Sequence, residues 1–187
     1  MKMRIALAVG ALVATPAHGP EAKETVKASA ASPAPPPEVK KTVDAFAGTW
    51  EFEGKVSGLP GAKEPSKAKE TLVCKKAGGG RIVSCSGKGS VASLGKIEDE
   101  TLIAWDAEAK NVRFVGMSST GELHDHTCHW KDDRTLACDP LSVTVEGHPA
   151  TVTLDATWAD AKHLSFNETT TMQDGSKLAF EGTAKRK

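Results

Sequence analysis

The sequence lacks an excess of charge of either sign, because its 24 Lys and Arg residues are matched by 24 Asp and Glu residues. Domains that bind nucleic acid usually gather basic residues on one face or along one helix. The composition therefore argues against nucleic acid as a partner. The chain also lacks any run of about 18 apolar residues, which predicts no membrane-spanning helix in the mature protein.

Tyrosine is absent, and aromatic residues make up only 5% of the chain. Few large side chains are thus available to build a core. We expect most of the tryptophans to pack in that core, with one or two at the mouth of any ligand cavity. These tryptophans are Trp50, Trp105, Trp130 and Trp158.

Motifs of recognisable catalytic chemistry are missing as well. The sequence contains no phosphate-binding glycine loop and no nucleophile motif. It also has no Cys-x-x-Cys pair of the kind that lowers a thiol pKa for redox chemistry. The sequence therefore predicts a protein that is not an enzyme and that uses no cofactor.

The N-terminus has the pattern of an export signal. Lys2 and Arg4 supply positive charge, residues 5–14 are mostly apolar, and Thr15-Pro16-Ala17 offers small residues for cleavage. This order is typical of a secretory signal peptide, so we expect residues 1–17 to be removed. No Cys follows the cleavage position, which disfavours a lipid anchor. The mature protein is then expected in the periplasm or outside the cell.

Residues 18–43 form a segment rich in Pro and Ala, with Pro35-Pro36-Pro37 as its densest run. Such a composition buries too little apolar surface to offset the entropy lost on ordering. We expect a disordered linker here and a folded domain over residues 44–187. A domain of about 150 residues buries roughly 68–70% of the surface that its unfolded chain exposes, which is enough for one core.

The folded domain is expected to be all-β. In residues 48–54, Trp50 and Phe52 alternate with polar residues, which is the period of a strand with one buried face. About ten similar short segments follow, separated by turn signals such as Gly79-Gly80 and Asp174-Gly175; the segment 135–145 is interrupted at Pro140. We expect no helix in the domain. Consecutive hairpins predict an antiparallel up-and-down β-barrel of about ten strands, because closure removes exposed edge strands.

The four cysteines are expected to form two disulfides, as is usual in an exported chain. Cys74 and Cys85 are equally distant from the turn at Gly79-Gly80, and Cys128 and Cys138 are equally distant from Asp133. Residues directly opposite in a hairpin have their Cβ atoms close to disulfide distance. We therefore predict the pairs Cys74–Cys85 and Cys128–Cys138.

The stretch from His124 to Trp130 is rich in chemically active side chains. On a strand, His124 and His126 share one face, and such a pair binds zinc or copper if a neighbouring strand adds a third ligand. A turn at residues 120–121 would place Met117 beside His124 and Val115 beside His126. Only Met117 suits a metal, namely copper, so the metal site is a minor alternative.

The other face of this stretch carries Asp125, Thr127 and His129, an arrangement that could serve acid–base chemistry. Which face points inward depends on the register. If the turn at residues 106–111 has even length, the apolar face of the preceding hairpin continues to Thr127 and His129, whereas a slip of one residue reverses the two faces. If the turn has even length, we expect a ligand site lined by Trp50, Phe52, Trp105, Phe114 and His129.

The motif Gly48-x-Trp50 resembles the Gly-x-Trp mark of the calycin superfamily, which includes lipocalins and nitrobindins. The longer run over residues 46–54, followed by residues 58–61, is similar to a bacterial secreted calycin-like domain family of unknown function. This resemblance covers most of residues 45–187. It implies an up-and-down barrel with a Trp closing one end and a cavity for an apolar ligand. Nitrobindins hold haem through a His, but Phe52 interrupts their repeating glycines, and no His of this chain corresponds to theirs.

These observations together predict an exported, non-enzymatic barrel that binds a small apolar or amphipathic molecule. One alternative is a filled barrel that serves as a protein-interaction module in the cell envelope, through loops such as residues 61–67. A metal or haem protein using the His124–His129 stretch is the third alternative. An open apolar cavity would distinguish the first interpretation from the second.

Overall fold

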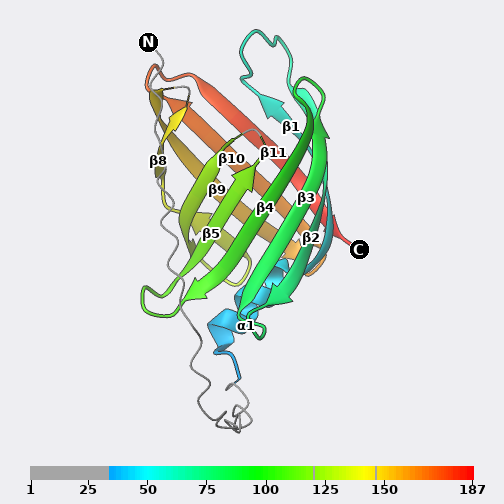
Figure 1. The fold of residues 1–187 in the computed structure, drawn as a ribbon, viewed down its shortest axis with the longest axis vertical. Coiled ribbons are helices and arrows are strands. Elements are labelled where there is room, and N and C mark those ends of the chain that lie inside the picture. Colours follow the sequence, from blue (N-terminus) through cyan, green and yellow to red (C-terminus); the bar gives the residue numbers. More distant parts are fainter. Residues whose placement is uncertain (1–33, 120, 146) are drawn as a thin grey trace, which may run out of the picture. The chain divides into compact units, whose positions relative to one another are not determined.

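The computed structural model describes residues 34–119, 121–145 and 147–187. The predicted signal peptide and residues 18–33 of the predicted linker lie outside these ranges. The described chain forms one helix, α1 (Pro37–Phe46), and an 11-stranded sheet (Figure 1). The strands are β1 (Gly48–Ser57), β2 (Ser66–Ala77), β3 (Ile82–Val91), β4 (Gly95–Asp106), β5 (Asn111–Ser118), β6 (Leu123–Trp130), β7 (Thr135–Cys138), β8 (Leu141–Val145), β9 (His148–Asp160), β10 (His163–Met172) and β11 (Lys177–Arg186).

The sheet closes into an antiparallel barrel, as predicted. Strands β1 to β6 each pair with the next strand in sequence, β11 pairs with β1, and β10 joins β11 to β9. Both β7 and β8 pair with β9, β7 at Thr135↔Thr157 and β8 at Leu141↔Val152. They are therefore two halves of one wall strand, interrupted at Pro140, which has no N–H to donate to a ladder. With β7 and β8 counted as one, ten strands form the wall.

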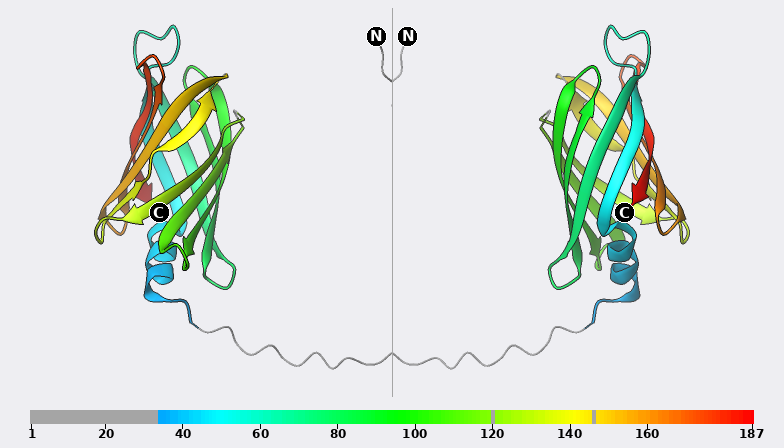
Figure 2. Two further views of the ribbon diagram at one scale, coloured as in Figure 1. Left: turned by 90° about the vertical axis from the view of Figure 1, so that its left-hand side faces the viewer. Right: turned by 90° about the vertical axis from the view of Figure 1, so that its right-hand side faces the viewer.

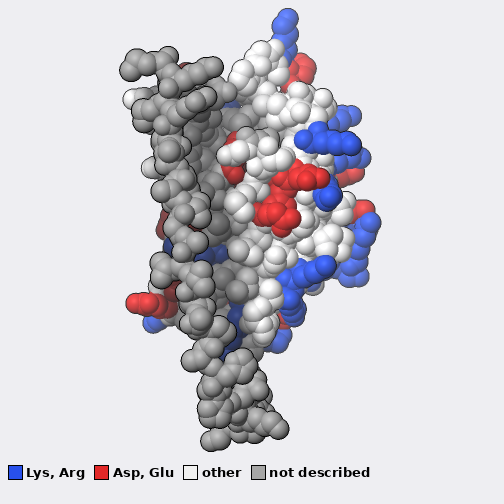
Figure 3. All heavy atoms as spheres, in the orientation of Figure 1, with Lys and Arg blue, Asp and Glu red and all other residues white. Residues whose placement is uncertain are grey.

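Alternating side chains place the core inside the barrel. Trp50 and Phe52 are buried on the inner face of β1, and β9 buries every second residue from Ala150 to Trp158. The outer face carries Lys and Arg intermixed with Asp and Glu (Figure 3). Cross-strand ion pairs on that face include Lys69–Glu53 at 2.8 Å and Lys88–Glu98 at 3.4 Å. The period-two pattern of the sequence therefore sorts apolar residues inward and charges outward.

Two inward-facing glycines make room for a large ring. Gly54 lies opposite Gly182 in the β1–β11 ladder, and the Phe52 ring, stacked on Phe180 at 4.7 Å between centroids, fills the space beside them. A Cβ added at Gly182 would overlap the Phe52 ring and lie 2.5 Å from the Glu53 carbonyl oxygen.

Gly182→Ala is therefore expected to destabilise the domain by about 1–3 kcal/mol, the usual cost of overpacking a core. Gly116→Ala is the matched control, because a Cβ there would meet its nearest atom, Thr101 Oγ1, at 3.5 Å. That control should change stability by less than about 0.5 kcal/mol or raise it slightly. Urea unfolding followed by tryptophan fluorescence measures both, and equal midpoints for the two variants would contradict this packing.

Helix α1 corrects two predictions, namely that the linker extends to residue 43 and that the folded domain has no helix. Pro37 stands in the first turn, where its missing N–H costs no helical hydrogen bond. Val39, Thr42, Val43 and Phe46 are buried at the i, i+3, i+4, i+7 positions of one helical stripe. The folded domain therefore begins within the segment predicted to be linker.

The helix packs against one end of the barrel, as both views in Figure 2 show. The Phe46 ring lies edge-on to Trp158 at 5.1 Å between centroids, and Trp50 Nε1 donates to the Phe46 carbonyl at 2.7 Å. Trp130 Nε1 also donates to Thr42 Oγ1 at 3.2 Å. From β11, Arg186 lies over the Trp50 ring at 4.4 Å and donates to the Asp44 carbonyl at 3.0 Å. Helix α1 at the start of the domain and β11 at its end thus both contact Trp50.

Both predicted disulfides are confirmed, since Cys74 bonds to Cys85 and Cys128 bonds to Cys138. Each pair is directly opposed in its ladder, β2–β3 and β6–β7 respectively. Helix α1, the one helix of the described residues, is too short and too polar to cross a membrane.

Candidate functional site

A cavity of ≈ 320 Å³ lies inside the barrel. Its walls are mainly apolar, and Phe46 of α1 contributes to its floor. The cavity extends toward the opposite end, where Leu94 and Met117 line it and are 55% and 57% exposed. The aromatic side chains that line it are Phe46, Trp50, Phe52, Phe114, Phe166 and Phe180.

Acidic side chains interrupt these apolar walls. Glu70 on β2, Asp99 on β4, Glu168 on β10 and Glu122 beside β6 all line the cavity. Burial raises the pKa of Glu70 to about 7, with a further contribution from the charge of Asp99. Burial likewise raises the pKa of Glu168 to about 7, helped by Glu122 and Asp99. These groups therefore exchange protons near neutral pH.

Asp99, a third carboxyl that is half-buried like the other two, also has a raised pKa. Burial is the main reason that its pKa is raised, and the charge of Glu122 adds to this, while a hydrogen bond from Ser118 opposes it. A neighbouring carboxylate thus raises the pKa of each of the three groups, because like charges disfavour one another's ionised form.

Glycines of β3 create the space for Glu70. Glu70 lies opposite Gly89 in the ladder, and a Cβ added at Gly87 would overlap its carboxylate oxygen Oε1. Neither Glu70 nor Glu168 was among the site residues predicted from the sequence. The alternation of residues along each strand could have indicated them. Glu70 shares the inner face of β2 with Leu72 and Cys74, and Glu168 shares the inner face of β10 with Phe166.

The two histidines predicted to share a face, His124 and His126, both point into the barrel. Their ladder partners are Gly116 and Phe114 rather than the predicted Met117 and Val115. The prediction was wrong by one residue because the hairpin closes on Ser118 and Glu122, around a loop of odd length. The apolar face of β4 and β5 therefore continues to His126 and Cys128, not to Thr127 and His129.

His126 is fully buried, and neither of its ring nitrogens has a hydrogen-bond partner. Burial, together with the neighbouring His124, lowers its pKa to about 4. Its ring lies 5.4 Å from that of His124, whose Nδ1 is 3.6 Å from Glu168 Oε1. Within the described residues, no group of three or more metal-ligating side chains forms around the pair, so nothing supports the predicted metal site.

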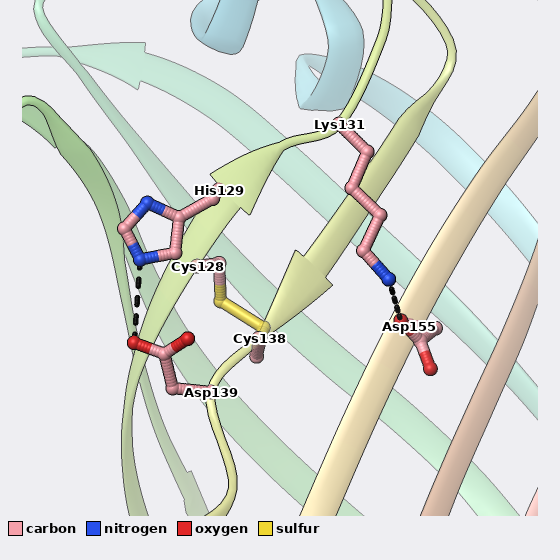
Figure 4. The surroundings of a disulfide bond; sticks show 6 residues. All are labelled: Cys128, His129, Lys131, Cys138, Asp139 and Asp155. Atoms are coloured by element: carbon pink, nitrogen blue, oxygen red, sulfur yellow. Dashed lines mark hydrogen bonds and ion pairs between the residues drawn. A yellow bond between two sulfur atoms is a disulfide. The ribbon is translucent and has the colours of Figure 1, made fainter.

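The predicted ligand-site residues divide into two groups. Trp50, Phe52 and Phe114 line the cavity, and their contact with a ligand stays a prediction. Trp105 packs against the core without lining the cavity. His129 lies on the outside, where Nε2 is 3.2 Å from Asp139 Oδ2 beside the Cys128–Cys138 disulfide (Figure 4). The prediction for His129 is therefore wrong, because it followed the reversed face of β6.

The fold and cavity define the class of up-and-down β-barrels with an interior cavity. No protein-family model matches the sequence, and no curated protein matches it either. Among solved structures, the chain is similar to the S-type phycobiliprotein lyase CPES from Guillardia theta, with a TM-score of 0.58 and 11% identity, over 80% of this chain and 92% of that chain. A de novo designed fluorescence-activating β-barrel matches at a TM-score of 0.43 and 15% identity, over 79% of this chain and 98% of that chain. The first likeness supports the barrel fold; it does not extend to function.

Proposed function

We propose that this protein is an exported carrier barrel that binds a small apolar or amphipathic molecule in its interior without transforming it. The observation that carries the proposal is the cavity, whose volume of ≈ 320 Å³ falls at the lower end of the range of known ligand pockets. Such pockets combine apolar walls with a few placed polar groups. A filled barrel acting as an interaction module would lack this space.

Export is supported by two independent features of the chain. Residues 1–17 have the order of a signal peptide, and two disulfides are typical of proteins that fold in an oxidising compartment. The resemblance of the first strand to secreted calycin-like domains points the same way. The S-type phycobiliprotein lyase shares the fold, but we propose binding rather than catalysis, since no nucleophile motif accompanies the interior carboxyls.

A native mass spectrum of protein purified from periplasm tests the proposal directly when set beside the denatured mass. The denatured mass is expected to fit cleavage after Ala17 and the loss of one hydrogen from each of Cys74, Cys85, Cys128 and Cys138. A native mass larger by a few hundred daltons would identify a retained ligand.

Filling the cavity should abolish binding. Gly116 lines the cavity, and a Cβ there would meet no atom closer than 3.5 Å, so Gly116→Leu projects a side chain into the ligand volume. We expect this variant to weaken binding of the neutral dye Nile red at least tenfold in a fluorescence titration. Val115→Leu is the matched control, because the adjacent residue points to the outside of β5. Unchanged dye affinity in Gly116→Leu, or loss of affinity in both variants, would contradict an interior site.

A further inference from the structure

Apart from His124, the ionisable groups of the cavity are all acidic. Carboxyl groups reach it from β2, β4 and β10, and from the residue preceding β6, while β6 itself adds His124. Among the described residues, no Lys or Arg lines the cavity. The outer face of the barrel is different, because there carboxylates pair with lysines of neighbouring strands. The cavity therefore carries negative charge, and no Lys or Arg among its described lining residues neutralises it.

This arrangement is unfavourable for an empty site. A carboxylate in an apolar enclosure loses its hydration, and it recovers that loss only through a cation or hydrogen-bond donors. Within the described residues, the carboxyl group of Glu70 makes no hydrogen bond or ion pair, and the charge of Asp99 adds to its raised pKa. In the same part of the chain, the Glu168 carboxyl pairs only with the imidazole of His124, at 3.6 Å. The walls thus supply less positive charge than the carboxyls require.

A second, separate observation also indicates a missing polar group. His126 is 0% exposed, points into the barrel, and contacts His124 and Phe114, both of which line the cavity. Both of its ring nitrogens are without a partner. Buried polar atoms in native proteins are nearly always paired. The imidazole of His126 therefore marks an unsatisfied polar position directly behind the cavity wall that His124 and Phe114 form.

Resting on the proposed function, we propose that the ligand of this cavity is a cationic amphiphile, a protonated amine on an apolar body. Glu70, Asp99 and Glu168 bind the ammonium group, and Phe52, Phe166 and Phe180 contact the apolar part. An ammonium group donates up to three hydrogen bonds and accepts none, which matches carboxylates that converge from three strands. Hydrogen bonds between charged partners are about twice as strong as neutral ones.

Proton release on binding is a consequence of this assignment. Two of the carboxyls have a pKa of about 7 in the empty barrel, so each is partly protonated at neutral pH. An ammonium group beside them favours the ionised form and therefore expels their protons. Calorimetric titrations at pH 7 in buffers of different ionisation enthalpy measure the number of protons released.

The test compares three probes of equal chain length, decylamine, decanol and decanoate, by isothermal titration calorimetry at pH 7. We expect decylamine to bind at least tenfold more tightly than decanol and decanoate, with proton release. Glu70→Gln and Glu168→Gln should each weaken decylamine binding at least tenfold and so remove the preference for decylamine over decanol, while tryptophan fluorescence shows that the variants are folded. Glu53→Gln is the control, since Glu53 lies outside and pairs with Lys69.

The outcomes separate this inference from the proposed function. Equal affinity for decylamine and decanol, or tighter binding of decanoate, would overturn the amine assignment while the interior binding site stands. The same holds if the two Gln variants keep the wild-type preference for decylamine. If none of the three probes binds and Nile red does not bind, the carrier function itself fails, and the amine assignment fails with it.

Discussion

Lowering the pH from 8 to 5 is expected to stabilise the ligand-free protein by about 3 kcal/mol. Glu70 and Glu168 have pKa values of about 7 in the fold, raised from 4.5. The folded state therefore holds more protons than the unfolded state between these values, and stability falls as the pH rises through the folded pKa. At pH 5 the two groups together contribute about 5 kcal/mol relative to pH 8, because each pKa unit corresponds to about 1.4 kcal/mol.

His126 acts in the opposite direction. Its pKa falls from 6.5 to about 4 on folding, so the unfolded state binds the proton first as the pH drops, and stability decreases below about pH 6.5. At pH 5 this costs about 2 kcal/mol, which is less than the two carboxyl groups contribute. The net result remains a domain that is more stable in mild acid.

Urea unfolding at pH 5 and pH 8, followed by tryptophan fluorescence, measures this difference. The double variant Glu70→Gln/Glu168→Gln should be more stable than the wild type at pH 8 and should lose most of the gain in stability at pH 5, leaving the opposing contributions of Asp99 and His126. Glu53→Gln serves again as the exterior control. A wild-type protein that is more stable at pH 8 than at pH 5 would show that the interior carboxyls are not desolvated as the cavity requires.

The strands and disulfides were predictable because their signals are local. Period-two alternation around Trp50 and the symmetry of Cys74 and Cys85 about a glycine turn each involve one strand or one hairpin. The break of the wall at Pro140 follows from the missing N–H of a single residue. Such features need no knowledge of the rest of the fold.

The inward face of β6 could not be predicted in the same way. Its assignment depends on the number of residues in the loop between Ser118 and Glu122, and a change of one residue exchanges His126 for His129 at the barrel interior. Both loop lengths are compatible with the turn residues of that segment. Packing of His126 against Phe114 goes with the inward face of β6, and no local sequence pattern predicts that contact.

The interior carboxyls illustrate a different difficulty. Glu70 and Glu168 each occupy an apolar face of a strand, and the alternation around them predicts an inward position. A lone Glu among charged neighbours is nevertheless a common surface pattern, as Glu51 and Glu53 are on β1. The groups form a common site only when closure of the barrel brings β2, β4 and β10 around one space.

Helix α1 was missed because Pro37, its lysines and the prolines before it resemble a linker, although Val39, Val43 and Phe46 have helical spacing. Its importance can be measured. Phe46→Ala is expected to destabilise the domain by about 3–5 kcal/mol, the usual cost of truncating a buried Phe. The side chain is 7% exposed and packs against both Trp158 and Phe114, so a cavity would remain at the barrel floor.

Urea unfolding of Phe46→Ala beside Lys40→Ala tests this role, because Lys40 is exposed on the same helix and its removal should change stability by less than about 0.5 kcal/mol. Phe46 also lines the ligand cavity, so the same truncation is expected to weaken Nile red binding. If Phe46→Ala unfolds at the wild-type midpoint, the helix is not part of the core. If it loses stability but keeps full dye affinity, the barrel alone forms the binding site, and α1 contributes to folding only.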